Sequence, residues 1–166
     1  MRRSRSAAGI AVLLTSTLFA VPAQAEERTC RWSLGAITVD NLRVPSGGSC
    51  TLEGTYVKGT VKVENRAKLK ATSVSVIRNV QAGGHADVTV ASSSVGGSIQ
   101  LKQGGSASVT SNRVNGDVQS FTNRGKQTIS KNRIDGDLQC KENVPAPTGS
   151  GNVVGGNKEE DQCRRL

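Results

Sequence analysis

Three short segments decide the fold: YVKGTVKV at residues 56–63, RVNGDVQS at residues 113–120 and RIDGDLQC at residues 133–140. In each segment, apolar residues alternate with polar ones on both sides of a glycine. Alternation of this kind is typical of β-strands, because successive strand side chains point to opposite faces. The three segments therefore predict one repeating strand–turn–strand unit.

The repeat continues along most of the chain at a spacing of 19 or 20 residues. One apolar column contains Val57, Val76, Val95, Val114, Ile134 and Val154, and a second contains Leu42, Val61, Val80, Ile99, Val118 and Leu138. A unit this short cannot bury its apolar face alone, whereas stacked units share a continuous core. We therefore expect an all-β fold, a single-stranded parallel β-helix of about six coils with three short strands per coil.

The size and spacing of the apolar residues refine this expectation. Aromatic residues make up only 2% of the chain, which suits a narrow coil filled by Val, Leu, Ile and Ala. The apolar spacing within a coil is uneven, and the coil is longer than the 18 residues of three regular six-residue sides. Both features favour the right-handed form of the β-helix.

Two polar columns are predicted to stabilise the stacking through amide hydrogen bonds along the helix axis. The first is an asparagine column at a turn, and the second is an outward-facing glutamine row that could alternatively serve as a flat binding face. The asparagines are Asn112, Asn132 and Asn152, and the glutamines are Gln81, Gln100, Gln119 and Gln139.

The first 25 residues have the features of a secretory signal peptide: a basic start, an apolar stretch and an A-x-A-type end at Ala25. We expect residues 26–49 to form an N-terminal cap and first partial coil, residues 50–157 the β-helix, and residues 158–166 a charged C-terminal cap. The mature chain would carry 19 basic and 13 acidic residues, a net charge of +6. It would be secreted, with no membrane attachment after cleavage.

The four cysteines all lie in the exported part, and an even count predicts two disulfides. Cys50 and Cys140 are nearly five coils apart, over ~20 Å at the spacing of stacked strands. A disulfide needs Cα atoms within ~7 Å. Crossed pairing would require both terminal segments to run the length of the helix. We therefore expect Cys30–Cys50 and Cys140–Cys163, one at each end.

These features resemble an uncharacterised family of small secreted right-handed β-helix proteins of actinobacteria, through the signal peptide, the Gly-Asp-Val-Gln coils and the ending QCKEN…GNVVGGNKEEDQC. The resemblance implies fold and export, and it implies no activity. The V-x-G-D-V and I-x-G-D-L coils also resemble bactofilins, which form filaments. The wider class of right-handed, pectin lyase-like β-helices includes pectate lyases and polygalacturonases.

Candidate chemistry is sparse. Asp117 and Asp137 occupy equivalent positions in adjacent coils, with Asp135 nearby, so a calcium ion could settle among them as in a lyase. The alternative is a solvated turn whose charge is neutralised by Arg113 and Arg133. The single histidine, His85, is expected to be an exposed loop residue. We expect no cofactor, and a non-enzymatic role is favoured over a pectate-lyase-like carbohydrate-active enzyme.

Basic residues gather in the early coils, where they could attract a cell-wall or extracellular anionic polysaccharide. They are Arg43, Lys58, Lys62, Arg66, Lys68 and Lys70. A merely solubilising surface is the alternative. Aromatic platforms for bases are missing, so sequence-specific nucleic-acid binding is not expected. Rows of Thr and Ser on one strand face also resemble those of ice-binding proteins, and a self-associating structural protein is a further alternative to the expected monomer.

Overall fold

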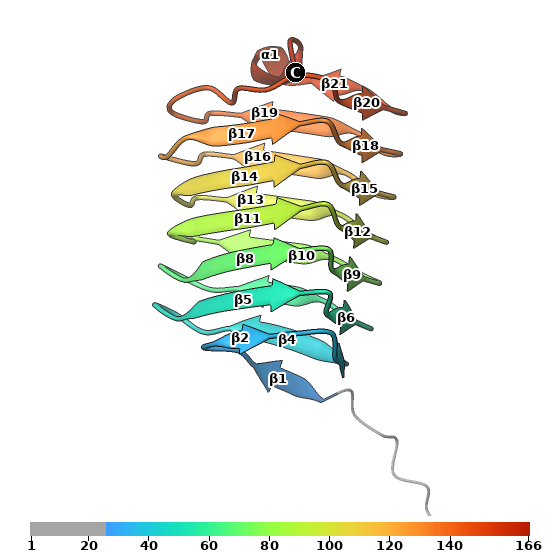
Figure 1. The fold of residues 1–166 in the computed structure, drawn as a ribbon. Coiled ribbons are helices and arrows are strands. Elements are labelled where there is room, and N and C mark those ends of the chain that lie inside the picture. Colours follow the sequence, from blue (N-terminus) through green and yellow to red (C-terminus); the bar gives the residue numbers. More distant parts are fainter. Residues whose placement is uncertain (1–25) are drawn as a thin grey trace, which may run out of the picture.

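The structure, a computed structural model, describes residues 26–166, so the predicted signal peptide at residues 1–25 lies outside it. The described chain winds into a parallel β-helix whose coils stack from the N-terminal end to the C-terminal end (Figure 1). Three parallel sheets run along the length of the helix. We call them sheets A, B and C.

Sheet A has eight strands, in the order β1 (Glu27–Thr29), β4 (Asn41–Val44), β7 (Val61–Val63), β10 (Val80–Gly83), β13 (Ile99–Lys102), β16 (Val118–Phe121), β19 (Leu138–Lys141) and β21 (Lys158–Glu159). Sheet B has six strands, β2 (Ser33–Leu34), β5 (Ser49–Glu53), β8 (Lys68–Thr72), β11 (Asp87–Ala91), β14 (Ser106–Thr110) and β17 (Gln127–Ser130). Sheet C has seven strands, β3 (Thr38–Val39), β6 (Tyr56–Val57), β9 (Ser75–Val76), β12 (Ser94–Val95), β15 (Arg113–Val114), β18 (Arg133–Ile134) and β20 (Val153–Val154).

The winding is right-handed. In Figure 1 the near strands β5, β8 and β11 run from left to right while the chain climbs from β1 to the C terminus. The prediction of a right-handed all-β helix with three strands per coil is confirmed. The solenoid has about seven turns, close to the six predicted. Residues 26–49 contribute β1–β4 to all three sheets.

The strand register matches the sequence columns. Val57, Val76 and Val95 are aligned across sheet C, and Leu42, Val61 and Val80 are aligned across sheet A. These side chains point inward and are almost fully buried. Because each coil covers the apolar residues of its neighbours, small aliphatic side chains fill most of the interior.

The asparagine column lies inside the helix and forms a continuous hydrogen-bonded chain, which we call the first asparagine ladder (Asn112, Asn132 and Asn152). The Asn132 side-chain oxygen accepts hydrogen bonds from the backbone N–H and the side-chain amide of Asn112, at 3.0 and 3.1 Å. The Asn132 amide in turn donates to Asn152 at 2.9 Å and to the buried carbonyl of Val109 at 2.8 Å. Each asparagine therefore completes the backbone hydrogen bonding of a turn.

The glutamine row lies in register on the outer face of sheet A. Gln81 donates to Gln100 at 3.3 Å, and Gln119 donates to Gln139 at 2.9 Å. The predicted amide stacking is thus present in two pairs.

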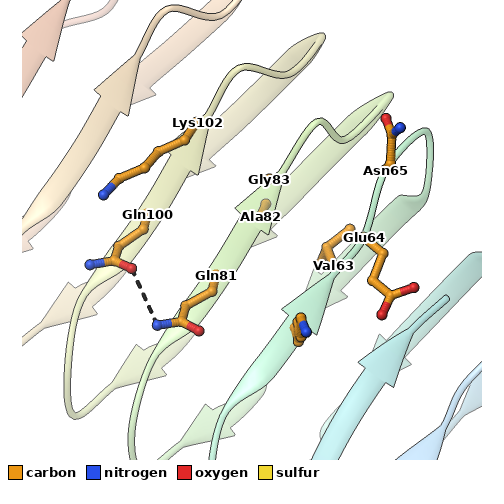
Figure 2. A pocket seen from close by; sticks show the side chains of 9 residues that line it. Val63, Glu64, Asn65, Gln81, Ala82, Gly83, Gln100 and Lys102 are labelled. Atoms are coloured by element: carbon orange, nitrogen blue, oxygen red, sulfur yellow. Dashed lines mark hydrogen bonds between the residues drawn. The ribbon is translucent and has the colours of Figure 1, made fainter. Parts of the chain in front are cut away.

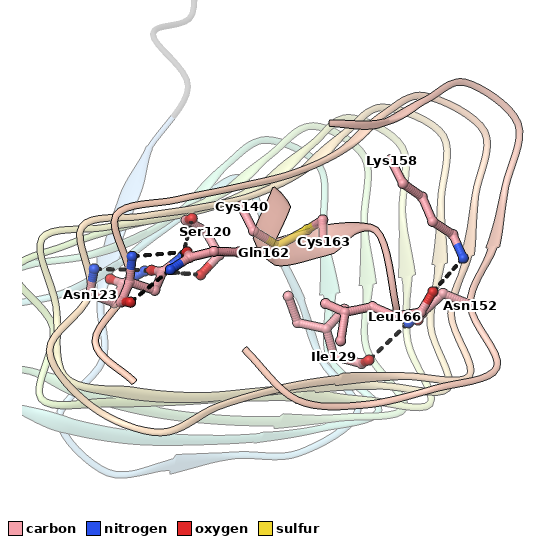
Figure 3. Close-up of a disulfide and its surroundings, with 10 residues drawn as sticks. Ser120, Asn123, Ile129, Cys140, Asn152, Lys158, Gln162, Cys163 and Leu166 are labelled. Carbon is pink, nitrogen blue, oxygen red and sulfur yellow. Dashed lines mark hydrogen bonds between the residues drawn. A yellow bond between two sulfur atoms is a disulfide. The ribbon is translucent and has the colours of Figure 1, made fainter. Parts of the chain in front are cut away.

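The structure contains both predicted disulfides, Cys30–Cys50 at the N-terminal end and Cys140–Cys163 at the C-terminal end. The helix α1 (Glu160–Cys163) lies across the last coil, where the second disulfide holds it against β19 (Figure 3). Cys140, Cys163 and Leu166 are buried there, and Lys158 donates to the Leu166 carbonyl. The C-terminal end is therefore covered, whereas Trp32 at the other end is 80% exposed.

Candidate polyanion-binding surface

The six basic residues predicted to bind polyanions lie on two faces of the helix. Arg43 and Lys62 belong to β4 and β7 of sheet A, and Lys68 and Lys70 belong to β8 of sheet B. Arg66 lies at the corner that joins these sheets, and Lys58 lies in the turn between sheets C and A. The structure therefore brings most of them around one edge of the solenoid.

Two of the six residues are ion-paired. Arg43 contacts Glu64 at 3.0 Å and Glu27 at 3.8 Å, and Lys58 contacts Asp40 at 3.1 Å. The hydrogen bond and charge of Lys58 lower the pKa of Asp40. Partial burial raises the pKa of Glu64, but hydrogen bonds from Ser46 and the charge of Arg43 outweigh it, so that pKa is lowered too. These pairs reduce the positive charge that Arg43 and Lys58 can offer a ligand.

The other four residues, which we call the basic corner, are Lys62, Arg66, Lys68 and Lys70. All four are exposed, and none forms an ion pair with another residue in the range 26–166. They come from a nine-residue stretch, so they project from one coil. Clustered cations without partners raise the local positive potential and attract anions.

A groove lies beside the basic corner on the outer face of sheet A (Figure 2). It has a volume of about 480 Å³, and its floor is formed by parts of β7 and β10. Lys62, Gln81, Gln100 and Lys102 project around it. The groove exists because Gly83 has no side chain at an outward position, and a Cβ atom there would have no neighbour within 4 Å.

The three acidic candidates are used for structural contacts. The Asp117 side chain accepts a hydrogen bond from the backbone N–H of Asp137 at 2.9 Å, and Asp137 accepts one from Asn157 at 2.7 Å. Asp135 lies between two arginines, 3.7 Å from Arg113 and 3.5 Å from Arg133. Within residues 26–166 no group of three or more His, Cys, Asp or Glu side chains is arranged to hold a metal ion.

The contacts of Asp117 and Asp137 belong to a set that we call the turn ladder: Asn41, Asn79, Ser98, Asp117 and Asp137. Each side chain accepts a hydrogen bond from a backbone N–H of the following coil. A Cβ atom at Gly136 would lie only 2.3 Å from the Asp117 carboxylate, so the glycine of the G-D pair leaves room for this contact.

The expectation that His85 is an exposed loop residue is wrong. Its side chain is only 2% exposed, and neither ring nitrogen has a hydrogen-bond partner among residues 26–166. The ring fits against Gly104 in the next coil, where a Cβ atom would lie 2.2 Å from it. Burial therefore lowers the pKa of His85, although the nearby Ala82 carbonyl and the Asp87 carboxylate partly oppose this shift.

The buried imidazole should make the protein less stable in mild acid. The unfolded chain takes up a proton as pH falls below the ordinary histidine pKa of 6.5, whereas the folded chain resists it. The free energy of unfolding should therefore fall between about pH 7.5 and about pH 5, by at most about 1.4 kcal/mol per pH unit. Urea unfolding of the wild type and of His85→Gln at several pH values gives the free energy of unfolding as a function of pH. The same pH dependence in both proteins would contradict the prediction.

A second buried ladder was not anticipated from the sequence. Asn123 and Asn143 are buried at the corner between sheets A and B, where Asn123 donates to Asn143 at 3.0 Å. Gln162 of α1 accepts from Asn143 at 3.1 Å and ends the chain of bonds (Figure 3). The 20-residue spacing of Asn123 and Asn143 was the signal that could have revealed it.

In the part of the chain that the structure describes, no helix is long and apolar enough to cross a membrane. The two disulfides fit an oxidising environment.

No family model, curated protein or solved structure matches this chain. The three parallel sheets and the two disulfides identify the chain as a disulfide-stapled parallel β-solenoid.

Proposed function

We propose that this protein is a secreted, non-enzymatic β-helix protein that binds an anionic polymer of the cell wall or extracellular space through the basic corner. The observation that carries the proposal is the presence of four exposed, unpaired cations on one coil, among residues 26–166. The predicted signal peptide, the resemblance to secreted actinobacterial β-helix proteins and the two disulfides support export.

The arrangement of the four cations suits a polymer better than a small ion. Lys62 projects from sheet A, and Lys68 and Lys70 project from sheet B, so a flexible chain of negative charges could follow the corner past Arg66. Charges at exposed sites attract through solvent, and salt screens them over about 8–10 Å at physiological ionic strength. Binding through this surface should therefore weaken as salt is added.

The charge-reversing variant Lys62→Glu with Lys70→Glu should bind anionic polymer about tenfold or more weakly, because each substitution replaces attraction by repulsion. Co-sedimentation with purified cell wall, teichoic acid-free wall and an insoluble acidic polysaccharide, across about 20 to 500 mM salt, measures the change.

The matched control is Lys126→Glu with Lys141→Glu, which makes the same change in net charge on exposed positions in the later coils. We expect this control to retain most of the binding. Equal losses in the two double variants would mean that net charge alone matters. Absence of wild-type binding to every anionic polymer would also overturn the proposal.

A further inference from the structure

The groove on sheet A is a gap in an otherwise filled outward column. Gly83 lies beside Lys102 in the strand register, and on the other side the register ends one residue earlier, at the pair of Ala82 and Val63, after which Glu64 follows. Phe121 and Lys141 fill the same column in the later coils. The missing side chain leaves an open space of about 480 Å³, within the range of roughly 300–1,000 Å³ that is usual for small-ligand sites.

The amides beside this space have free hydrogen-bonding atoms. The Gln81 amide nitrogen donates to the Gln100 oxygen at 3.3 Å, which leaves the Gln81 oxygen and the Gln100 nitrogen for a ligand. The glutamine row is broken at this point, because the buried oxygen of Gln119 has no partner in the described chain. An acceptor and a donor therefore stand side by side at the groove, a pattern that suits the hydroxyl groups of a sugar.

Two cations stand on either side of the amides. Lys62 is exposed and lies one coil below Gln81 in the register. Lys102 projects from the far side, with its ammonium group 5.5 Å from the centre of the Phe121 ring (Figure 2). Its long, flexible stem allows the ammonium to turn toward a ligand above Gly83. Lys62 and, once its ammonium turns from Phe121, Lys102 thus supply positive charge at two sides of the groove, with neutral amides between them. The Glu64 carboxylate also lines the groove, but it is paired with Arg43 at 3.0 Å.

Two other ligand classes fit this groove less well. Strands β7, β10 and β13 are each paired on both sides, so no free strand edge is available for an extended peptide. The lining residues include no aromatic ring on which a base could stack.

We propose that the groove binds one acidic sugar unit, with its carboxylate or phosphate between Lys62 and Lys102, its hydroxyls on Gln81 and Gln100, and its body above Gly83. This inference rests on the proposed function, because the groove would bind one repeating unit of the same anionic polymer. Teichoic acids and uronate polysaccharides share this chemistry, so both are tested.

The decisive variant is Gly83→Tyr, which fills the groove without changing the net charge. A side chain at this position meets open space, so the fold should tolerate it. Ser94→Tyr is the matched control, because Ser94 is exposed and lies in the sheet C column that already accommodates Tyr56. Titration calorimetry with an uronate trisaccharide, a three-unit glycerol phosphate oligomer and a neutral trisaccharide measures site binding, and polyphosphate co-sedimentation measures charge-driven binding.

We expect the wild type and Ser94→Tyr to bind one or both acidic oligomers at least tenfold more tightly than the neutral one. Gly83→Tyr should lose at least tenfold in that affinity and keep its binding to polyphosphate. The variant Lys102→Gln should weaken oligomer binding severalfold, also without affecting polyphosphate.

Three results would overturn the inference: no binding of either acidic oligomer, equal binding of the neutral one, or an unchanged affinity in Gly83→Tyr. If polyphosphate and wall binding persist in any of these cases, only the groove assignment fails. If the oligomers bind but no polymer does, the proposed function fails while the groove remains a sugar site.

Discussion

Replacing Asn132 with leucine should lower the free energy of unfolding by about 3–5 kcal/mol, because each buried polar group left without a partner costs about 1–3 kcal/mol. Leucine has a similar size, so the loss comes from hydrogen bonds rather than from a cavity. The side chain of Asn132 accepts two hydrogen bonds and donates two. Its removal leaves the backbone N–H of Asn112 and the carbonyl of Val109 buried without these partners.

Urea unfolding followed by circular dichroism measures this effect. The control is Asn115→Leu, at an exposed position in the preceding coil, which should change the free energy of unfolding by no more than about 0.5 kcal/mol. A loss below about 1 kcal/mol in Asn132→Leu would mean that water replaces the ladder contacts and that the apolar core alone holds the coils together.

Removing the Cys140–Cys163 disulfide by a double substitution to alanine should cost about 3 kcal/mol, from the added freedom of the unfolded chain. The two cysteines are separated by 23 residues in the sequence and are both fully buried. The loss should also release α1 from the last coil, because the disulfide joins this helix to β19. The freed coil would expose strand edges that can pair with another molecule.

The matched control is the double alanine variant of Cys30 and Cys50, which are separated by 20 residues. Its loss in unfolding free energy should be similar, since the entropy depends weakly on loop length. Light scattering should show more aggregation for the C-terminal variant, since only that variant uncovers an end that is covered in the wild type. Equal scattering by the two variants would contradict the role of α1 as a cover.

The fold was predictable because every coil repeats the same physical requirement. A strand pair such as Val61 and Val63 must point inward at each level, so the apolar columns appear directly in the sequence. The first coil is harder to recognise because its spacing differs: Glu27 pairs with Asn41, only 14 residues later. The coil length and the uneven apolar spacing predicted the handedness. The distance between coils along the axis predicted the disulfide pairing.

The site was less predictable because it depends on what surrounds each residue. His85 reads as a loop residue, and its burial depends on the absence of a side chain at Gly104 in the next coil. The groove likewise depends on Gly83, a residue that the sequence alone gives no reason to distinguish from the turn glycines. The basic residues were recognisable as a group, but the pairing of Arg43 with Glu64 required the register of β4 and β7.

The ladders have a consequence for how such a protein can change in length. In the asparagine ladders, a backbone N–H donates to a side chain in the following coil, as from Asn112 to Asn132. In the turn ladder, the acceptor lies in the preceding coil, as from Asp137 to Asp117. Each coil therefore depends on both neighbours, so an inserted residue that moves a ladder side chain out of its column breaks bonds in two directions. The ladders do continue across coils of both 19 and 20 residues, so an extra residue is accommodated where it lies between the ladder positions. Duplication or deletion of a whole coil keeps every column in register, which makes the coil the natural unit by which this molecule can lengthen or shorten.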